Sequence, residues 1–212
     1  MRVIAGKFRS RKLRTLHGLE LRPTSDRLRE TLFNILGPAV AGSVFVDLFA
    51  GSGAVGIEAI SRGADEVFFV ENHAPAAAII RKNLESLGVP VSGLSPGKPR
   101  VEILGVDILR GLETLARRHV AADFIYVDPP YRAHQEYERA LEFLSGPHLL
   151  AAEGIIIVEH FIRDLAPPKG HSRELTGLPQ WALPERWGAL ERMRVVEQGD
   201  TALSFYCLAR AA

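Results

Sequence analysis

The chain has 212 residues, of which 47% are hydrophobic and 24% charged, the balance of a globular protein. No apolar run approaches the roughly 20 residues that a membrane helix requires, and the basic start lacks the apolar stretch of a secretory signal. The single cysteine, Cys207, excludes an internal disulfide and a thiolate-rich metal site. We therefore expect a cytoplasmic protein that does not associate with membranes.

Positive charge is concentrated near the N-terminus. Residues 1–43 contain nine Lys or Arg against three acidic residues, a net of +6, whereas the remainder carries a net of −5. A basic arm on a mildly acidic body allows a protein to bind a polyanion locally. A solvated, flexible tail has the same composition, so charge alone indicates only a nucleic acid or another anionic surface. We expect residues 1–22 to form a basic extension and residues 23–212 to form the main domain.

The first expected elements are short. Residues 1–22 have an extended or hairpin-like pattern. The run Pro23-Thr24-Ser25-Asp26 predicts the start of a helix, because hydroxyl and carboxylate side chains cap the first backbone N–H groups. An apolar stripe follows, and Gly37-Pro38 predicts the end of this helix.

From residue 44, short apolar runs alternate with helical patterns. Strands are expected at Val44–Phe49, Val67–Val70, Val101–Leu104, Phe124–Val127 and Ile155–Val158, and helices near 54–62, 74–87, 108–118 and 134–145. This alternation indicates a parallel sheet covered on both faces. Two final strands, near 190–197 and 202–209, are separated by a predicted hairpin turn. The expected fold is therefore α/β and Rossmann-like, with a seven-stranded, mostly parallel sheet that ends in an antiparallel hairpin.

A glycine-rich loop follows the first strand of this sheet. Gly51 and Gly53 allow the backbone to approach a ligand closely, and Gly56 allows the next helix to pack near the strand. The spacing fits both a dinucleotide and S-adenosylmethionine. Asp47 favours S-adenosylmethionine, because a carboxylate there repels a pyrophosphate and suits an ammonium or sulfonium group.

Two further acidic residues stand at strand ends. Glu71 ends the second strand and is suited to accept the ribose hydroxyls of an adenosine. Asp107 follows the third strand, where its side chain is suited to bind the adenine amino group. Asp107 is equally suited to be the N-cap of the next helix, and the two roles are compatible.

The run Asp128-Pro129-Pro130-Tyr131 follows the fourth strand, at the same sheet edge as the glycine loop. Two prolines make a stiff turn that presents a carboxylate and a free carbonyl as paired acceptors. Such a pair suits the exocyclic amine of a base, whose lone pair becomes nucleophilic when both N–H groups are held. Tyr131 is suited to stack on the base. A simple turn after a strand is the alternative.

The motifs together resemble a known family. Asp-Pro-Pro-Tyr with Phe49-x-Gly51-x-Gly53 resembles the methyltransferases that act on N6 of adenine or N2 of guanine. Three N-terminal runs, Met1–Gly6, Arg9–Leu13 and Leu21–Asn34, are similar to the RsmD family, bacterial methyltransferases of a guanine N2 in 16S ribosomal RNA. The resemblance covers residues 1 to about 160.

This resemblance implies S-adenosylmethionine as cofactor and 16S ribosomal RNA, in a partly assembled small subunit, as substrate. It implies a catalytic role for Asp128, Pro129, Pro130 and Tyr131. The expected cofactor-binding residues are Asp47, Phe49, Ala50, Gly51, Ser52, Gly53, Glu71, Asn72, Asp107 and Ile108, with Thr24 and Arg29 at the methionine end. The expected RNA-binding residues are Arg9, Arg11, Lys12, Arg14 and Arg22.

Three alternatives remain open. An adenine-N6 methyltransferase of RNA or DNA needs the same amine receptor, so the motif does not separate it from a guanine-N2 enzyme. A nicotinamide-dependent oxidoreductase rests on the glycine pattern alone, and a non-catalytic RNA-binding assembly factor rests on the basic arm alone. The seven histidines show no ligand-like pairing, so no metal is expected, and we expect a monomer.

Overall fold

The computed structural model describes residues 1–15, 25–91, 97–130, 133–146, 148–162 and 183–209. Its strands are β1 (Val44–Leu48), β2 (Glu66–Val70), β3 (Arg100–Leu104), β4 (Ala122–Val127), β5 (Leu150–Phe161), β6 (Arg186–Trp187), β7 (Leu190–Gln198) and β8 (Thr201–Leu208). Its helices are η1 (Gly6–Phe8), α1 (Asp26–Leu36), η2 (Gly37–Val40), α2 (Ala54–Ser61), α3 (Ala74–Ser86), α4 (Ile108–Arg117) and α5 (His134–Leu144).

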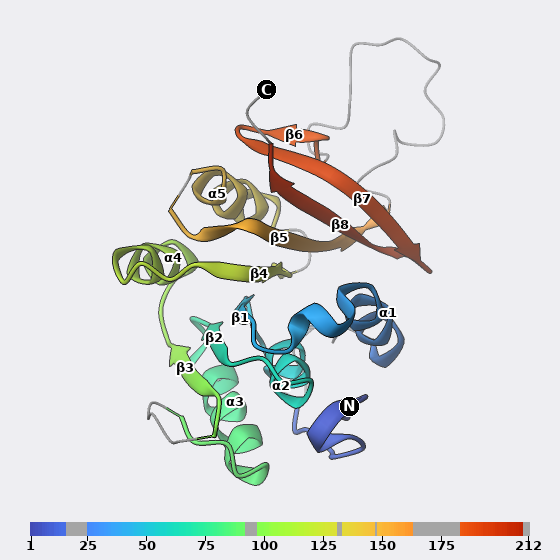
Figure 1. The fold of residues 1–212 in the computed structure, drawn as a ribbon, viewed down its shortest axis with the longest axis vertical. Coiled ribbons are helices and arrows are strands. Elements are labelled where there is room, and N and C mark those ends of the chain that lie inside the picture. The colour runs from blue at the N-terminus through green and yellow to red at the C-terminus, as the bar shows by residue number, and fades with distance from the viewer. Residues whose placement is uncertain (16–24, 92–96, 131–132, 147, 163–182, 210–212) are drawn as a thin grey trace.

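The described strands form one mixed sheet in the order β3-β2-β1-β4-β5-β8-β7-β6 (Figure 1). The pairs β1–β2, β2–β3, β1–β4 and β4–β5 are parallel, whereas β8 is antiparallel to both β5 and β7. The chain moves outward from β1 to β3 and then returns to β4 on the other side of β1. The carboxyl ends of β1 and β4 therefore flank a topological switch point, where open α/β sheets bind ligands.

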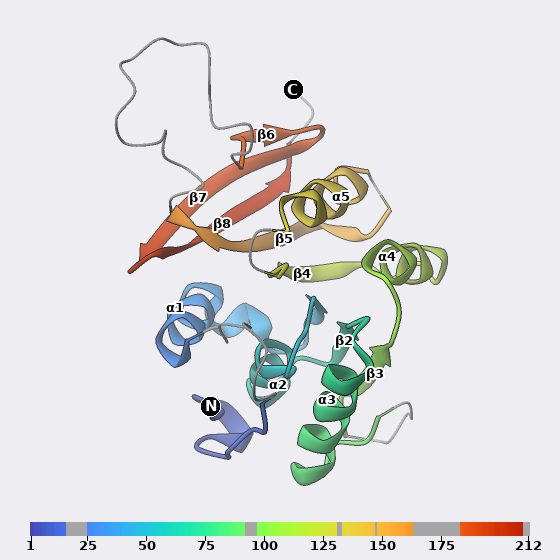
Figure 2. The ribbon, with the colours of Figure 1, turned by 180° about the vertical axis from the view of Figure 1, so that it is seen from behind.

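Helices cover both faces of the sheet (Figures 1 and 2). On one face, α1, α2 and α3 bury an apolar cluster that includes Leu32, Ile57 and Ile80. On the opposite face, α4 and α5 bury a second cluster that includes Leu112 and Leu141. This double burial explains the near-continuous apolar sequence of the central parallel strands.

The expected α/β sheet is confirmed, with two differences in detail. The sheet has eight strands among the described residues because the two-residue strand β6 pairs with β7 at the edge. Strand β5 is also longer than the apolar run Ile155–Val158, since it begins at the buried Leu150 and passes through two exposed residues, Ala152 and Glu153, before that run. The expected hairpin turn lies between β7 and β8, where Gly199 has φ +65°.

The first helix begins as its sequence predicts. Ser25 is the N-cap of α1, and its hydroxyl accepts the Leu28 backbone N–H at 3.1 Å. The helix ends at Leu36, and Gly37 follows with φ +58°. None of the helices in the described part of the chain is long and apolar enough to span a membrane.

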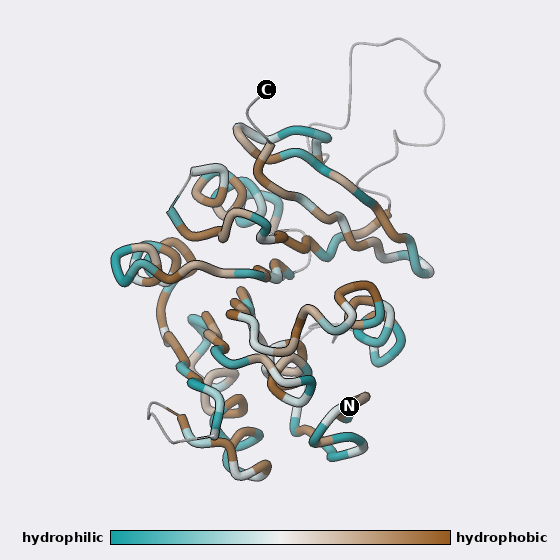
Figure 3. The backbone as a smooth tube through the Cα atoms, viewed as in Figure 1, coloured by the Kyte–Doolittle hydropathy of each residue, from teal (hydrophilic) through white to brown (hydrophobic). Residues whose placement is uncertain are grey.

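Residues 1–15 pack against the domain. An isolated antiparallel bridge joins Arg2 to Lys12 around η1. Val3 is 1% exposed and Leu13 7% exposed, while the run Arg9–Lys12 between them is hydrophilic, and hydrophilic stretches mark this N-terminal segment in Figure 3. At Gly6, a Cβ atom would lie 1.9 Å from the Ser61 carbonyl oxygen of α2. The described part of the basic arm is therefore anchored through its backbone and apolar residues.

Candidate functional site

The loop between β1 and α2 has an unusual backbone. Phe49, Gly51 and Gly53 have φ values of +58°, +55° and +76°. A non-glycine residue with positive φ is uncommon and persists only where its surroundings fix it. Two backbone hydrogen bonds of Ala50 fix this loop. The Ala50 N–H donates to the Val70 carbonyl at 3.2 Å, and the Ala50 carbonyl accepts the Gly53 N–H at 2.7 Å.

Asp47 lies beneath this loop, in β1, and is 2% exposed. Its Oδ2 accepts the Gly56 N–H at 2.8 Å. Burial raises the pKa of Asp47 to about 8; the Gly56 hydrogen bond opposes this rise, and the charge of Glu71 adds to it. A buried acid of this kind favours a nearby cation, because a positive charge stabilises its ionised form.

Gly56 is held close to the sheet. A Cβ atom at this position would lie 2.3 Å from the Phe69 ring and 3.1 Å from Asp47 Oδ2. The packing role expected for this glycine is therefore confirmed, and the close approach also brings the Gly56 N–H to Asp47.

Glu71 follows β2 and is 8% exposed. Its Oε2 accepts the Gly51 N–H at 2.8 Å, and its Oε1 accepts the His73 N–H at 2.8 Å. Glu71 therefore ties the glycine loop to the end of the neighbouring strand. Each carboxylate oxygen has a second lone pair for a ligand hydroxyl. Asn72, beside it, is exposed.

Asp107 is the N-cap of α4, as the sequence predicts. Its Oδ1 accepts the Leu109 N–H at 3.0 Å, and the Arg139 guanidinium lies 3.0 Å from the same oxygen. Ile108, the first residue of α4, is buried. The ion pair with Arg139 joins α4 to α5 and has no local sequence signal, since 32 residues separate the partners.

The three carboxylates stand at the ends of β1, β2 and β3, which are neighbours in the sheet. This donor set fits a ligand that carries hydroxyl groups, an amino group and a positive charge. It fits a pyrophosphate poorly, because like charges repel in a partly buried site.

The Asp128-Pro129-Pro130 turn leaves β4 beside the glycine loop. Val127, the last residue of β4, pairs with Leu48, the last residue of β1. Asp128 and Phe49 therefore begin two adjacent loops at the same sheet edge. Asp128 is partly exposed, Pro129 buried and Pro130 exposed. Tyr131, Thr24 and Arg22 lie outside the described residues, so their expected roles remain predictions.

A second carboxylate that the sequence did not suggest lies at the level of Asp128. Glu159 follows Val158, which pairs with Val127 across β4 and β5. The buried Tyr126 donates its hydroxyl to the Glu159 carboxylate, and the Tyr137 hydroxyl donates to the Glu159 carbonyl at 3.0 Å. These bonds hold β5 next to the strand that leads into the Asp128-Pro129-Pro130 turn.

Asn83 of α3 connects the N-terminal segment to the glycine loop. It is 1% exposed. Its Oδ1 accepts the Arg14 N–H at 2.8 Å, and its Nδ2 donates to the Arg14 and Ser52 carbonyls at 3.1 and 3.0 Å. The only sequence signal for this contact is a polar residue on the apolar stripe of a helix.

Arg29 occupies a buried position in α1. Its side chain is 0% exposed; the guanidinium donates to the Arg2 carbonyl and to Asp26 Oδ1, and Nε lies 3.9 Å from Glu58 Oε2. Glu58 also accepts the Ile4 and Ala5 N–H groups at 2.7 and 3.0 Å. In the described structure, Arg29 therefore joins the N-terminal segment to α1 and α2, and its cofactor role remains a prediction.

The arm residues proposed to bind RNA face solvent. Arg9, Arg11, Lys12 and Arg14 are exposed. Only Arg11 has a described hydrogen bond from its side chain, to the Ser86 carbonyl at 2.9 Å. The same segment thus packs through its backbone and presents its cations outward.

Comparisons with known proteins agree with this architecture. The family model described as Conserved hypothetical protein 95 matches residues 1–175. YlbH of Bacillus subtilis, provisionally described as an rRNA methyltransferase, is 32% identical over 206 residues, covering 97% of this chain and 98% of that protein. Ribosomal RNA small subunit methyltransferase D of Escherichia coli is 33% identical over 198 residues, covering 93% and 86%. The solved structure of yhhF from Escherichia coli, provisionally described as a methyltransferase, has a TM-score of 0.73 at 28% identity, covering 99% and 98%.

Proposed function

Since the chain belongs to the family described as Conserved hypothetical protein 95, we propose that it is an S-adenosylmethionine-dependent methyltransferase of ribosomal RNA. The finer proposal is transfer of a methyl group to N2 of a guanine in 16S ribosomal RNA within a partly assembled small subunit. The observation that carries the proposal is the position of Asp128-Pro129 beside the glycine loop, at the ends of paired strands β4 and β1.

The cofactor supplies an electrophilic methyl group on a sulfonium. The glycine loop and the carboxylates of Asp47, Glu71 and Asp107 would hold it. The buried Asp47 carboxylate suits its positive charge, and Glu71 suits its ribose hydroxyls. Phe49, Ala50, Ser52 and Gly53 are the loop residues proposed to contact it, with Asn72 and Ile108 at the adjoining strand ends.

Asp128 and the Pro129 carbonyl would accept the two N–H groups of the guanine amine. In this geometry the nitrogen lone pair points away from the acceptors and toward the methyl group, and the acceptors stabilise the positive charge that develops on nitrogen. Methyl transfer would form a C–N bond as the sulfonium S–C bond breaks, and Asp128 would accept the proton that the nitrogen loses. Tyr131 would stack on the extruded base.

Arg9, Arg11, Lys12, Arg14 and Arg22 would contact phosphates of the RNA. Arg11→Ala with Lys12→Ala is expected to reduce the log–log salt slope of RNA binding by roughly 0.7–0.9 for each phosphate that the variant no longer neutralises. A slope equal to that of the wild type would argue against this role.

Mass spectrometry of nucleosides from 16S ribosomal RNA, incubated with the protein and isotope-labelled S-adenosylmethionine, tests the function. We expect label in N2-methylguanosine. Label in N6-methyladenosine would replace the guanine proposal with the adenine alternative. Absence of labelled nucleoside from both naked RNA and small-subunit particles, prepared from a strain lacking the enzyme, would overturn the proposal.

A further inference from the structure

A row of exposed basic side chains follows the outer side of the N-terminal segment and continues onto the body of the domain. We call it the arm track; its residues are Lys7, Arg9, Arg11, Lys12, Arg14, Lys82 and Lys98, all exposed. Lys82 belongs to α3, and Lys98 precedes β3.

Specific contacts bring the body residues to the arm. The Arg11 guanidinium donates to the Ser86 carbonyl, and Lys82 lies one helical turn before Ser86, on the same side of α3. Further along, Arg14 is bound to Asn83, the residue next to Lys82. Lys82 therefore lies within one helical turn of Asn83 and Ser86, the two residues of α3 that contact Arg14 and Arg11.

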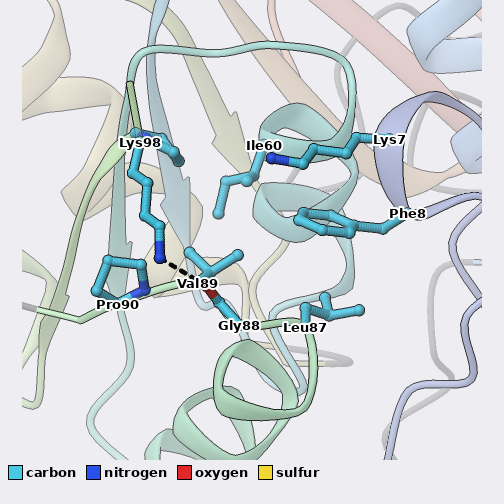
Figure 4. A pocket seen from close by; sticks show the side chains of 9 residues that line it. Lys7, Phe8, Ile60, Leu87, Gly88, Val89, Pro90 and Lys98 are labelled. Atoms are coloured by element: carbon cyan, nitrogen blue, oxygen red, sulfur yellow. Dashed lines mark hydrogen bonds between the residues drawn. The ribbon is translucent and has the colours of Figure 1, made fainter. Parts of the chain in front are cut away.

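At the other end of the track, Lys7 and Lys98 line opposite sides of a small pocket (Figure 4). Its apolar floor includes Phe8, Ile60 and Val89, and the Lys98 ammonium lies 3.5 Å from the Gly88 carbonyl. This pocket lies where α2 and α3 end, and hence at the amino edge of the sheet. The track runs from there to Arg14, which Asn83 joins to Ser52 of the glycine loop.

The charges of the track are not neutralised by the described protein. None of its seven side chains forms an ion pair with another residue that the structure describes, whereas Arg62, Arg100 and Arg118 are paired with Glu58, Glu66 and Glu102. Residues 1–15 contain no acidic residue. A line of uncompensated cations is the feature that attracts a phosphate backbone, which releases its counterions on binding.

We propose that the arm track is a phosphate-binding surface for the RNA substrate, and that Lys82 and Lys98 are phosphate-binding residues contributed by the body of the domain. The inference rests on the proposed function for the identity of its polyanion. It extends that function by assigning a path for the RNA, from the amino edge of the sheet along α3 to the glycine loop.

The test compares two double variants of equal charge change. Lys82→Ala with Lys98→Ala removes two track cations. Arg110→Ala with Arg117→Ala removes two exposed cations from α4, on the opposite face of the sheet. The affinity for a 16S ribosomal RNA fragment is measured as a function of salt, and the rate of methyl transfer is measured over a range of RNA concentrations up to saturation.

We expect the track variant to reduce the salt slope by roughly 1.4–1.8, since two phosphates are no longer neutralised, and to raise KM for RNA with kcat and melting temperature unchanged. The α4 variant should retain the wild-type slope. A wild-type slope in the track variant, or an equal reduction in the α4 variant, would overturn the proposal. Salt-sensitive binding through the track without methyl transfer would leave the track in place and overturn the catalytic function instead.

Discussion

The Asn83 amide of α3 donates to the Ser52 carbonyl at 3.0 Å, and thereby fixes the glycine loop from a helix 31 residues further along the chain. The same side chain pairs with both backbone groups of Arg14. One buried amide therefore couples the basic arm to the loop that we propose binds the cofactor.

Replacement of Asn83 by Leu is expected to destabilise the protein and weaken cofactor binding. It leaves the Arg14 N–H and the Ser52 carbonyl, which take part in partly buried hydrogen bonds, without their described partner, at a cost of up to about 1–3 kcal/mol for each group. Loss of about 1 kcal/mol of loop stabilisation by the Asn83–Ser52 hydrogen bond corresponds to roughly a fivefold rise in the Kd of S-adenosylhomocysteine. Calorimetry measures this, with the exposed Glu85→Ala on the same helix as control. An unchanged Kd would show that the loop does not depend on this bond.

Asp128→Ala is expected to reduce methyl transfer by at least about a hundredfold, because it removes one of the two acceptors that orient the amine. The Kd for S-adenosylhomocysteine should stay within a factor of about two or three of the wild-type value. This corresponds to roughly 0.5 kcal/mol, the usual effect of a substitution on the surface. Single-turnover kinetics measure the first effect and calorimetry the second. Glu138→Ala, an exposed substitution on α5, is the control. Near-normal turnover by the Asp128 variant would contradict the mechanism.

Asp47 should make cofactor binding pH-dependent. Its folded pKa is raised to about 8 from an ordinary value of 3.8, so its contribution to stability is full below pH 3.8 and is lost as the pH rises through about 8. A bound cation favours the ionised form. Affinity for S-adenosylmethionine should therefore increase between about pH 6 and 8, with proton release. Affinity for S-adenosylhomocysteine, which lacks the sulfonium charge, should change less.

Calorimetry in buffers of different ionisation enthalpy measures the released protons. Asp47→Asn keeps an acceptor for the Gly56 N–H and cannot ionise, so proton release should disappear. Equal proton release by Asp47→Asn and wild type would assign the proton to another group.

Gly56→Ala is expected to destabilise the fold by about 2 kcal/mol through overpacking. The new Cβ would lie 2.3 Å from the Phe69 ring, whereas a Cβ at Gly105 meets nothing within 4 Å. Denaturant unfolding of Gly56→Ala and Gly105→Ala gives the comparison. Equal midpoints for the two variants would mean that α2 moves away from β2 without cost.

His160 should reduce stability at acidic pH. Its Nδ1 lies 3.1 Å from the Phe161 carbonyl and its Nε2 2.8 Å from the Ser204 hydroxyl. Burial lowers the pKa of His160 to about 4; the Phe161 hydrogen bond opposes this shift, and the charge of Arg192 adds to it. The unfolded state therefore binds the extra proton, and stability is lost as the pH falls from about 6.5 toward 4, by an amount on the order of 3 kcal/mol.

Unfolding free energies at pH 7 and pH 4.5 measure this decrease. It should be smaller in His160→Gln than in wild type, and unchanged in His73→Gln, which is exposed. The same decrease in all three proteins would assign the pH dependence to other groups.

The sequence by itself determined the central strands and helices and the sheet edge at which the proposed site lies, but it gave no signal for the two-residue strand β6. The strand–helix alternation, the Ser25 cap and the Asp107 cap are local features that a chain displays within a few residues. Parallel strands also place their carboxyl ends together, so the glycine loop and the Asp128 turn were predicted to meet.

Only the tertiary structure decided which distant side chains hold these loops. Asn83 binds residues 69 and 31 positions away, and Arg139 reaches Asp107 across 32 residues. Tyr126 reaches Glu159 across 33 residues. No periodic pattern encodes such pairs, because they arise from how helices pack on the sheet. The same holds for the basic N-terminal segment. Its positive charge was evident in the sequence, but its attachment to the domain depends on Glu58 of α2 and Asn83 of α3, which are buried polar residues.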